Sequence, residues 1–186
     1  TVVSVQDFWC WYNNLPSVTK VKAGTSYHLM KNGIRPVWED PANVDGGSFC
    51  LRISKKFSCY VWEVLCMMTI GEQFDDALHP NDEVHGISVS VRRSGDDVIT
   101  IWTKNAFAFD DYKMMAQLSK FMHPDAYSRL KLPIYKVHKN ETDFQDSSES
   151  SCTDMSLNSS VSDLSFDSST DLSLDLSDLS LDDNNV

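Results

Sequence analysis

Residues 141–186 contain no lysine and no arginine. The whole chain carries 16 Lys and Arg against 27 Asp and Glu, which argues against a nucleic-acid ligand because phosphate neutralisation needs basic groups. Residues 1–140, however, hold all 16 basic residues and 15 of the acids, whereas residues 141–186 hold 12 acids. The acidity therefore belongs to the C-terminal segment, and the charge of residues 1–140 does not exclude a nucleic-acid ligand.

The sequence also lacks a hydrophobic run long enough to cross a bilayer. The longest, at residues 64–70, falls far short of the roughly 20 residues that a spanning helix needs. There is no signal-peptide pattern and no C-x-x-C pair, and the cysteines are odd in number. These absences predict a soluble protein with reduced cysteines, cytosolic or nuclear, without a structural zinc site; of the two compartments we expect the cytoplasm. Thr1 is not an initiator methionine, so we expect further residues upstream.

Periodicity of the apolar residues predicts mixed secondary structure within residues 1–140. Helical spacing favours three helices, the first opened by a capping serine, Ser4. Alternation predicts five strands, two of them joined by a turn at 94–97. Because strands and helices mix without regular βαβ alternation, the fold class is α+β, an antiparallel sheet with helices on one face. The predicted helices are 5–14, 57–70 and 106–122, and the predicted strands are 27–30, 48–54, 86–92, 98–102 and 132–137.

Residues 141–186 form a second region with its own composition. They include 14 serines and an Asp-Leu-Ser repeat, with little apolar surface to offset the entropy of ordering, so we expect a disordered acidic tail after a domain at 1–140. Some serines have an acid three residues on, a spacing that acidophilic kinases favour, which makes phosphorylation a hypothesis. The alternative is a solubilising tail without a specific role. The serines are Ser151, Ser160, Ser168 and Ser180.

A predicted loop at 36–47 presents Trp38 beside Glu39. A methylated guanine is cationic, and an indole face attracts such a ring by stacking and by cation–π attraction. One carboxylate can accept both hydrogen-bond donors on the Watson–Crick edge of guanine. Considered alone, however, such a pair is more often a half-buried aromatic beside a solvated acid.

Several motifs share their order and spacing with one known family. They are Val5-Gln6-Asp7-Phe8-Trp9, the run at 27–34, Pro36-Val37-Trp38-Glu39-Asp40, Gly46-Gly47, and the shorter matches at 70–72, 89–92 and 101–102. Over about residues 4–138 the chain resembles the translation initiation factor 4E family. The resemblance implies a curved antiparallel sheet backed by helices on its convex face, with the 7-methylguanosine 5′ cap of mRNA held on the concave face. It implies a binding protein, not an enzyme, and no cofactor.

The resemblance also assigns roles to four side chains. Trp38 is one slice of an aromatic sandwich, Glu39 reads the guanine edge, Trp102 contacts the methyl group and Arg92 meets the triphosphate. The second stacking tryptophan of the family lies upstream of the first helix and outside this chain. One missing stacking face should weaken cap binding by roughly one to two powers of ten. The register of Arg93 stays open, because the segment 92–102 is one residue longer than usual.

Two departures from the family concern the phosphate contacts. Asp96 and Asp97 stand where the founding factor has a lysine in the hairpin, and Ser48 stands where a basic residue often follows the paired glycines. Thinner phosphate contacts, together with the sequences at 62–63 and 71–74, favour the second-class, 4E-homologous branch, which includes translational repressors.

The resemblance implies a partner-protein surface as well, made by Val5, Trp9 and Met67 on the convex side. In the family this surface receives a Tyr-x-x-x-x-Leu-hydrophobic helix of scaffold or inhibitor proteins, and an exposed indole beside aliphatic groups is a typical anchor for such a helix. On pattern alone, Trp9 is more often an ordinary core residue under the first helix, and it is the resemblance that favours the partner surface.

Other functions stay open. A 4E-like scaffold or decoy with weak or lost cap binding would fit the missing tryptophan and the thin phosphate site. A hydrolase built on Cys50 or Cys59 has no motif in its favour. His79 and His85, with the acids at 82–83, match no metal template, so we expect no metal.

Overall fold

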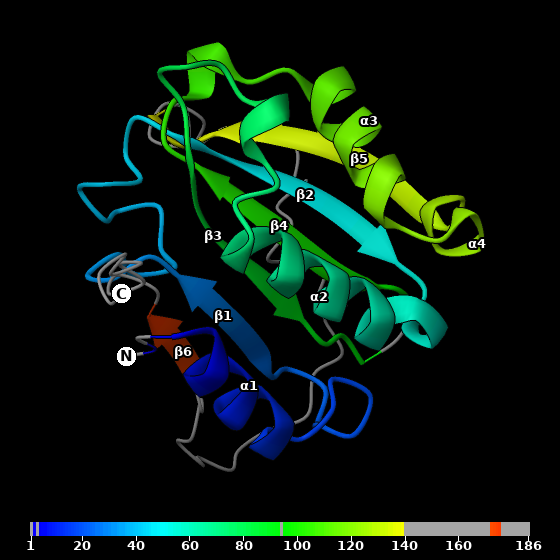
Figure 1. Cartoon of the computed structure of the whole chain (residues 1–186). Coiled ribbons are helices and arrows are strands. Elements are labelled where there is room, and N and C mark those ends of the chain that lie inside the picture. The colour runs from blue at the N-terminus through cyan, green and yellow to red at the C-terminus, as the bar shows by residue number, and fades with distance from the viewer. Residues whose placement is uncertain (1, 3, 94, 140–171, 176–186) are drawn as a thin grey trace, which may run out of the picture.

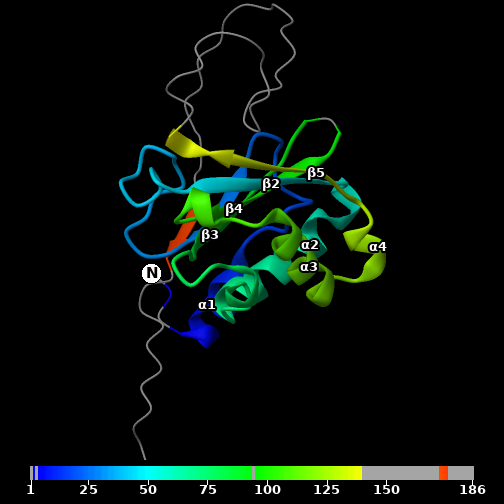
Figure 2. The ribbon, with the colours of Figure 1, turned by 90° about the horizontal axis from the view of Figure 1, so that it is seen from above.

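The computed structural model describes residues 2, 4–93, 95–139 and 172–175. It contains an open six-stranded sheet in the order β5-β2-β4-β3-β1-β6, and the helices lie together on one side of it (Figures 1 and 2). The strands are β1 Ser26–Met30, β2 Gly47–Ile53, β3 Val84–Ser90, β4 Asp97–Thr103, β5 Leu130–Val137 and β6 Leu172–Asp175. The helices are α1 Val5–Asn14, α2 Lys55–Ile70, α3 Asp111–Phe121 and α4 Pro124–Tyr127, with 3-10 turns η1 Asp75–Ala77 and η2 Ala106–Ala108.

Strand alternation gives the sheet two chemically different faces. Phe49 pairs with Ile101, and Ile101 with Ile87, so these fully buried side chains stand in one row against the helices. The neighbouring row, on the other face, is polar, because Thr100 pairs with Ser88 and also with a cysteine of β2. We call the two sides the helix face and the open face. The predicted α+β class, with helices on one face of an antiparallel sheet, is confirmed.

The first two helices lie close to their predicted positions. The Ser4 hydroxyl accepts a hydrogen bond from the Asp7 backbone at 3.1 Å, as the capping pattern predicted, and α1 buries Phe8. The second helix begins at residue 55, two residues before the predicted start. It ends before Gly71 as predicted, although the residue with positive φ (52°) is Glu72.

The prediction of one helix over 106–122 is wrong in its first third. Asn105 caps the short turn η2, and Phe109 is extended (φ −75°, ψ 136°). Asp110 then caps a new helix by accepting from the Lys113 backbone at 3.0 Å. Phe109 leaves the helical path because its ring stacks on Tyr135 of β5, 3.9 Å between centroids. The sequence reading also missed α4, which begins at Pro124, where a proline is tolerated because no backbone N–H is needed.

Four residues of the tail differ from the expected disorder. Leu172–Asp175 form β6, which pairs in parallel with β1 at the edge of the sheet. The rest of the predicted tail, including the four candidate phosphorylation sites, lies outside the described residues. In the part of the chain that is described, none of the helices has the length and hydrophobicity needed to cross a membrane.

Candidate functional site

A long loop joins β1 to β2 and passes one end of the sheet. It leaves β1 after Met30, which pairs with Gly86 of β3, and Gly86 pairs in turn with Trp102 of β4. It enters β2 at Gly47, which pairs with Thr103. Because β3 and β4 lie between β1 and β2, the loop crosses the end of the sheet at which Trp102 stands.

The three residues of the Trp-Glu-Asp run have different environments within this loop. Trp38 is half-buried, Glu39 is exposed and Asp40 is buried. Asp40 accepts backbone hydrogen bonds from Ala42 at 3.0 Å and Arg35 at 3.1 Å. The Ala42 N–H, with further help from Arg35, holds the pKa of the Asp40 carboxyl below its usual range. Asp40 is therefore a structural residue that shapes the loop, and Glu39 presents the carboxylate that a ligand can reach.

Asn43 connects the same loop to the strands behind it. Its side-chain amide donates to the carbonyls of Arg35 and Val37, both at 2.9 Å, on either side of the turn that precedes Trp38. Its Oδ1 lies 3.1 Å from Nδ1 of His85 on β3. Both Asn43 and His85 are buried. The sequence analysis did not single out Asn43, because an asparagine in a loop carries no distinctive pattern.

Trp102 stands on the open face in a polar setting. Its Nε1 donates to the Ser88 hydroxyl at 2.9 Å, and Nδ1 of His28 lies 2.7 Å from that same hydroxyl. The ring of His138 lies 5.4 Å from the Trp102 ring, tilted by 51°. Trp102 is half-buried. Strand alternation could have placed Ser88 and His28 on the face of Trp102, since they occupy neighbouring pairs in the register.

Arg92 and Trp102 lie far from each other along the direction of the strands. Trp102 pairs with Gly86 near the start of β3, whereas Arg92 follows the end of that strand, six residues on. At about 3.3 Å per residue the two positions are roughly 20 Å apart along the strand. The predicted site is thus elongated, with the loop and Trp102 at one end and Arg92 at the other.

Asp97 has a different role from the one that the sequence predicted. Its buried carboxylate accepts from Lys55 Nζ at 2.6 Å, the Ser58 hydroxyl at 2.6 Å and the Arg92 backbone at 3.0 Å. It therefore faces α2, on the helix side. Asp96 forms an ion pair with Lys131 at 2.9 Å. The hairpin still lacks a lysine, but the charge of Asp97 is matched by Lys55 instead of facing the open side.

A basic residue that the sequence analysis missed lies beside Ser48. Lys136 of β5 is the cross-strand partner of Ser48, and Ser48 is also the partner of Trp102, so the three side chains leave the same face. Residues paired across adjacent strands share a face, which is why only the pairing of β2 with β5 could reveal this position.

The helix face carries the residues predicted to bind a partner. Val5 is 45% exposed and Met67 is 42% exposed, while Trp9 is half-buried and packs edge-on against Phe8. Burial raises the pKa of the Tyr12 hydroxyl, and residues of α2 reinforce the shift. Tyr12 therefore lies close to α2. Trp9 packs against Phe8 with part of its ring and leaves the rest exposed.

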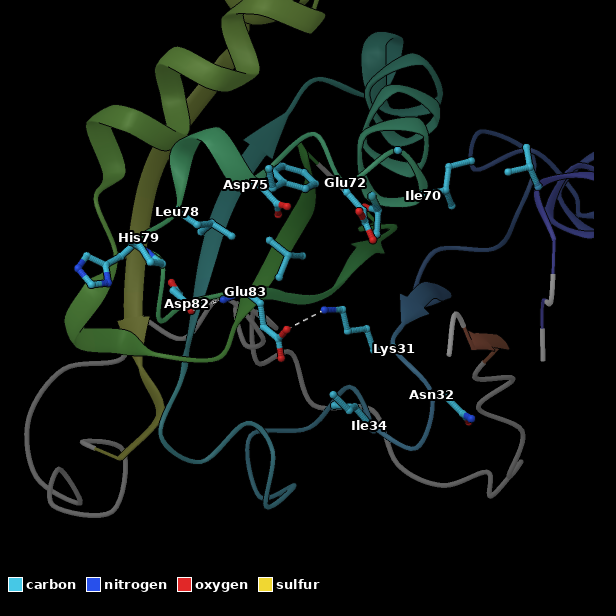
Figure 3. Close-up of a pocket in the computed structure, with 16 residues that line it drawn as sticks. Lys31, Asn32, Ile34, Ile70, Glu72, Asp75, Leu78, His79, Asp82 and Glu83 are labelled. Atoms are coloured by element: carbon cyan, nitrogen blue, oxygen red, sulfur yellow. Dashed lines mark hydrogen bonds and ion pairs between the residues drawn. The ribbon is translucent and has the colours of Figure 1, made fainter. Parts of the chain in front are cut away.

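A cavity of about 1140 Å³ lies next to this surface (Figure 3). Its lining includes Val5 of α1, residues 70–72 at the end of α2, and the ion pair between Lys31 and Glu83 (3.0 Å). Val5 and the C-terminal end of α2 thus border the same hollow, which places them near each other on the helix face.

The two cysteines considered for a hydrolase both lie near hydroxyl groups in the structure. The thiol of Cys50 lies 3.9 Å from the Thr100 hydroxyl, and that of Cys59 lies 3.3 Å from the Ser17 hydroxyl. Among residues 2, 4–93, 95–139 and 172–175, no three His, Cys, Asp or Glu side chains gather closely enough to hold a metal ion. The acids at 82–83 with His79 and His85 thus do not form such a group.

The buried His85 predicts a dependence of stability on pH. Burial lowers its pKa from the ordinary value of 6.5, although the Glu83 carboxylate, 3.3 Å from Nε2, opposes the shift. As the pH falls below 6.5, the unfolded chain takes up the proton before the folded chain does, so the free energy of unfolding should decrease. Urea unfolding between about pH 7.5 and pH 5.5 measures this slope. The slope should be smaller in His85→Gln and unchanged in His79→Gln, an exposed control; equal slopes in wild type and His85→Gln would contradict the assignment.

Fold and site together define a class of protein. It has an open sheet with helices on one face, and at one end of the open face it carries the loop of Trp38 together with a second tryptophan, Trp102. The family model of eukaryotic initiation factor 4E matches residues 1–153, and the chain belongs to this family. Eukaryotic translation initiation factor 4E of Dictyostelium discoideum is 43% identical over 104 residues, 55% of this chain and 40% of that protein. The chain thus spans less than half the length of that relative.

Solved structures agree with the family. The complex of C. elegans eIF4E-3 with the 4E-binding protein Mextli and cap analog has a TM-score of 0.58 at 33% identity, covering 74% of this chain and 76% of that one. The complex of Ascaris suum eIF4E-3 with m2,2,7G cap has a TM-score of 0.59 at 30% identity, covering 79% and 78%. Membership in the initiation factor 4E family, expected from the sequence motifs, is therefore confirmed.

Proposed function

We propose that this protein binds the 7-methylguanosine 5′ cap of mRNA on its open face and a regulatory protein on its helix face, in translation initiation or its repression. The observation that carries the proposal is the loop with Trp38 and Glu39, which crosses the sheet at the end where Trp102 stands. The relatives support it, since the C. elegans eIF4E-3 structure holds a cap analog and a 4E-binding protein.

The chemistry of the loop suits a methylated guanine. The half-buried indole of Trp38 offers a face for stacking and cation–π attraction, and the exposed carboxylate of Glu39 can accept from the two donors of the guanine edge. Trp102, held by Ser88 through Nε1, contacts the methyl group at the same end of the sheet. Binding of this kind needs no catalytic step, so we propose a binding protein without enzymatic activity.

Arg92 serves the phosphates in this proposal. Two hydrogen bonds hold its backbone. The Arg92 N–H donates to the Asp97 carboxylate, and Lys55 Nζ donates to the Arg92 carbonyl at 2.6 Å. A triphosphate leading away from the base along the open face runs toward Arg92. The hairpin that follows Arg92 has Asp96 and Asp97 and no lysine, which keeps the proposed phosphate contacts few, in line with the second-class branch.

The helix face fits a helical partner of the Tyr-x-x-x-x-Leu-hydrophobic type. Val5 and Met67 are exposed aliphatic side chains, and the half-buried Trp9 belongs to the same surface in the family pattern. Burial of exposed aliphatic groups and one indole is the usual basis of helix-in-groove recognition. A cytoplasmic location, where capped mRNA is translated, follows from this function and is part of the proposal.

The experiment that tests cap binding is a titration of the intrinsic tryptophan fluorescence with a 7-methylguanosine triphosphate analogue. Saturable quenching is expected, and Glu39→Gln should weaken binding at least roughly ten-fold, because it loses a charge-assisted hydrogen-bond pair and turns an N–H₂ toward the donors of guanine. Unmethylated guanosine triphosphate, whose ring is not cationic, should bind more weakly than the analogue. Absence of quenching in the wild-type chain would instead support the scaffold or decoy function.

A further inference from the structure

Two buried residues outside the predicted site connect its separate parts. The first is Asn43, whose side-chain amide donates both of its hydrogens to backbone carbonyls of the loop, those of Arg35 and Val37. With its two donors used, Oδ1 acts as the acceptor for the Nδ1–H of His85, whose Nε2 faces the Glu83 carboxylate. The side chain of Asn43 thus ties the backbone just before Trp38 to strand β3.

The second residue is His138, at the end of β5. Its Nδ1 lies 2.7 Å from the backbone carbonyl of Asn43, and since a carbonyl only accepts, Nδ1 carries the proton. Its Nε2 lies 2.6 Å from the Ser48 hydroxyl on β2, and its backbone N–H donates to the Gly46 carbonyl at 3.1 Å. The ring of the same histidine contacts that of Trp102.

These contacts form a continuous path from the loop to the second tryptophan. On one side of His138 is the loop that carries Trp38 and Glu39, and on the other is the indole of Trp102. His138 and Asn43 are 3% and 0% exposed, so water does not compete for their hydrogen bonds. A displacement of the loop would break the hydrogen bonds of Asn43 with His138 (2.7 Å) and with His85 (3.1 Å), all three of which are buried.

We propose that Asn43 and His138 are positioning residues of the cap site: they fix the loop of Trp38 and Glu39 relative to Trp102. The inference rests on the proposed cap binding and adds to it, since neither residue is expected to touch the ligand. A ligand held between several groups binds tightly only when these groups are already placed before it arrives. Loosening the loop should therefore weaken cap binding while the sheet and helices stay folded.

The test uses variants that change hydrogen bonding with little change of shape. Asn43→Asp turns two donors into acceptors facing the carbonyls of the loop, and its matched control is Asn81→Asp, an exposed site with the same change of charge. His138→Phe keeps a ring beside Trp102 but loses both ring nitrogens. His138→Asn restores a donor near the place of Nδ1 and should rescue most of the binding.

The expected result has two parts. Asn43→Asp and His138→Phe should weaken binding of the 7-methylguanosine triphosphate analogue roughly 5- to 100-fold, the range for losing hydrogen bonds of buried groups. Hydrogen exchange of the backbone amides of Asn43, Val44 and Gly46, which are bonded within the loop, should accelerate in both variants, with the amides of α2 unchanged. Asn81→Asp should match the wild type in both measurements.

Other results of these two measurements would contradict the positioning role or the proposed cap binding. Wild-type affinity in both variants, or accelerated exchange in α2 as much as in the loop, would overturn the positioning role, the second because it shows a general loss of stability. Should the wild-type chain itself not bind the analogue, cap binding fails as the proposed function. The exchange measurement then decides whether Asn43 and His138 hold the loop: acceleration confined to the loop supports it, and unchanged exchange overturns it.

Discussion

Asp97→Ala should lower the free energy of unfolding by about 3 kcal/mol, because it leaves buried partners of a carboxylate unpaired. The Ser58 hydroxyl is fully buried, and the Arg92 N–H loses its acceptor as well. Lys55 is 42% exposed, so water can solvate its ammonium again and limits the total cost. Urea unfolding followed by circular dichroism gives the value.

A neighbouring aspartate provides the control. Asp96 forms an ion pair with Lys131, whose side chain is 55% exposed, so Asp96→Ala should cost less than about 1 kcal/mol. Asp97→Asn, which keeps an acceptor for the Arg92 N–H, should fall between the two. If Asp97→Ala is no more destabilising than Asp96→Ala, the buried cluster does not anchor the hairpin, and the fixed backbone proposed for Arg92 fails with it.

Trp38→Ala should weaken binding of the cap analogue roughly 5- to 150-fold, the equivalent of about 1–3 kcal/mol for one stacking face. The residue is half-buried in a loop, so the unfolding midpoint should change much less than it would for a core residue. Calorimetry suits the measurement, because removing a tryptophan alters the fluorescence signal itself.

Trp11→Ala is the matched variant for this comparison. Trp11 lies on α1, on the helix face, and is 55% exposed. Its removal should leave cap affinity within two-fold of wild type, roughly the scatter expected for a distant surface change. Equal affinities of Trp38→Ala and the wild-type chain would remove Trp38 from the site and count against the open face as the place of cap binding.

The sequence by itself determined the elements whose signals are local. The capping serine and the apolar spacing placed α1, and strict alternation placed Phe49 and Leu51 in the core of β2. The hairpin between β3 and β4 followed from its turn residues, and the Trp-Glu-Asp motif marked the loop. Each of these signals lies within a few residues of the chain, so neighbouring side chains alone carry it.

Only the tertiary structure decided features that depend on partners distant in sequence. Phe109 leaves the predicted helix because Tyr135 of β5 stacks on its ring. Asp97 turns to the helix side because Lys55 and Ser58 of α2 donate hydrogen bonds to its carboxylate. The path from Asn43 through His138 to Trp102 joins residues up to 95 positions apart. Propensity and periodicity do not register such pairs, because burial and hydrogen bonding between distant segments arise only when the sheet brings them together.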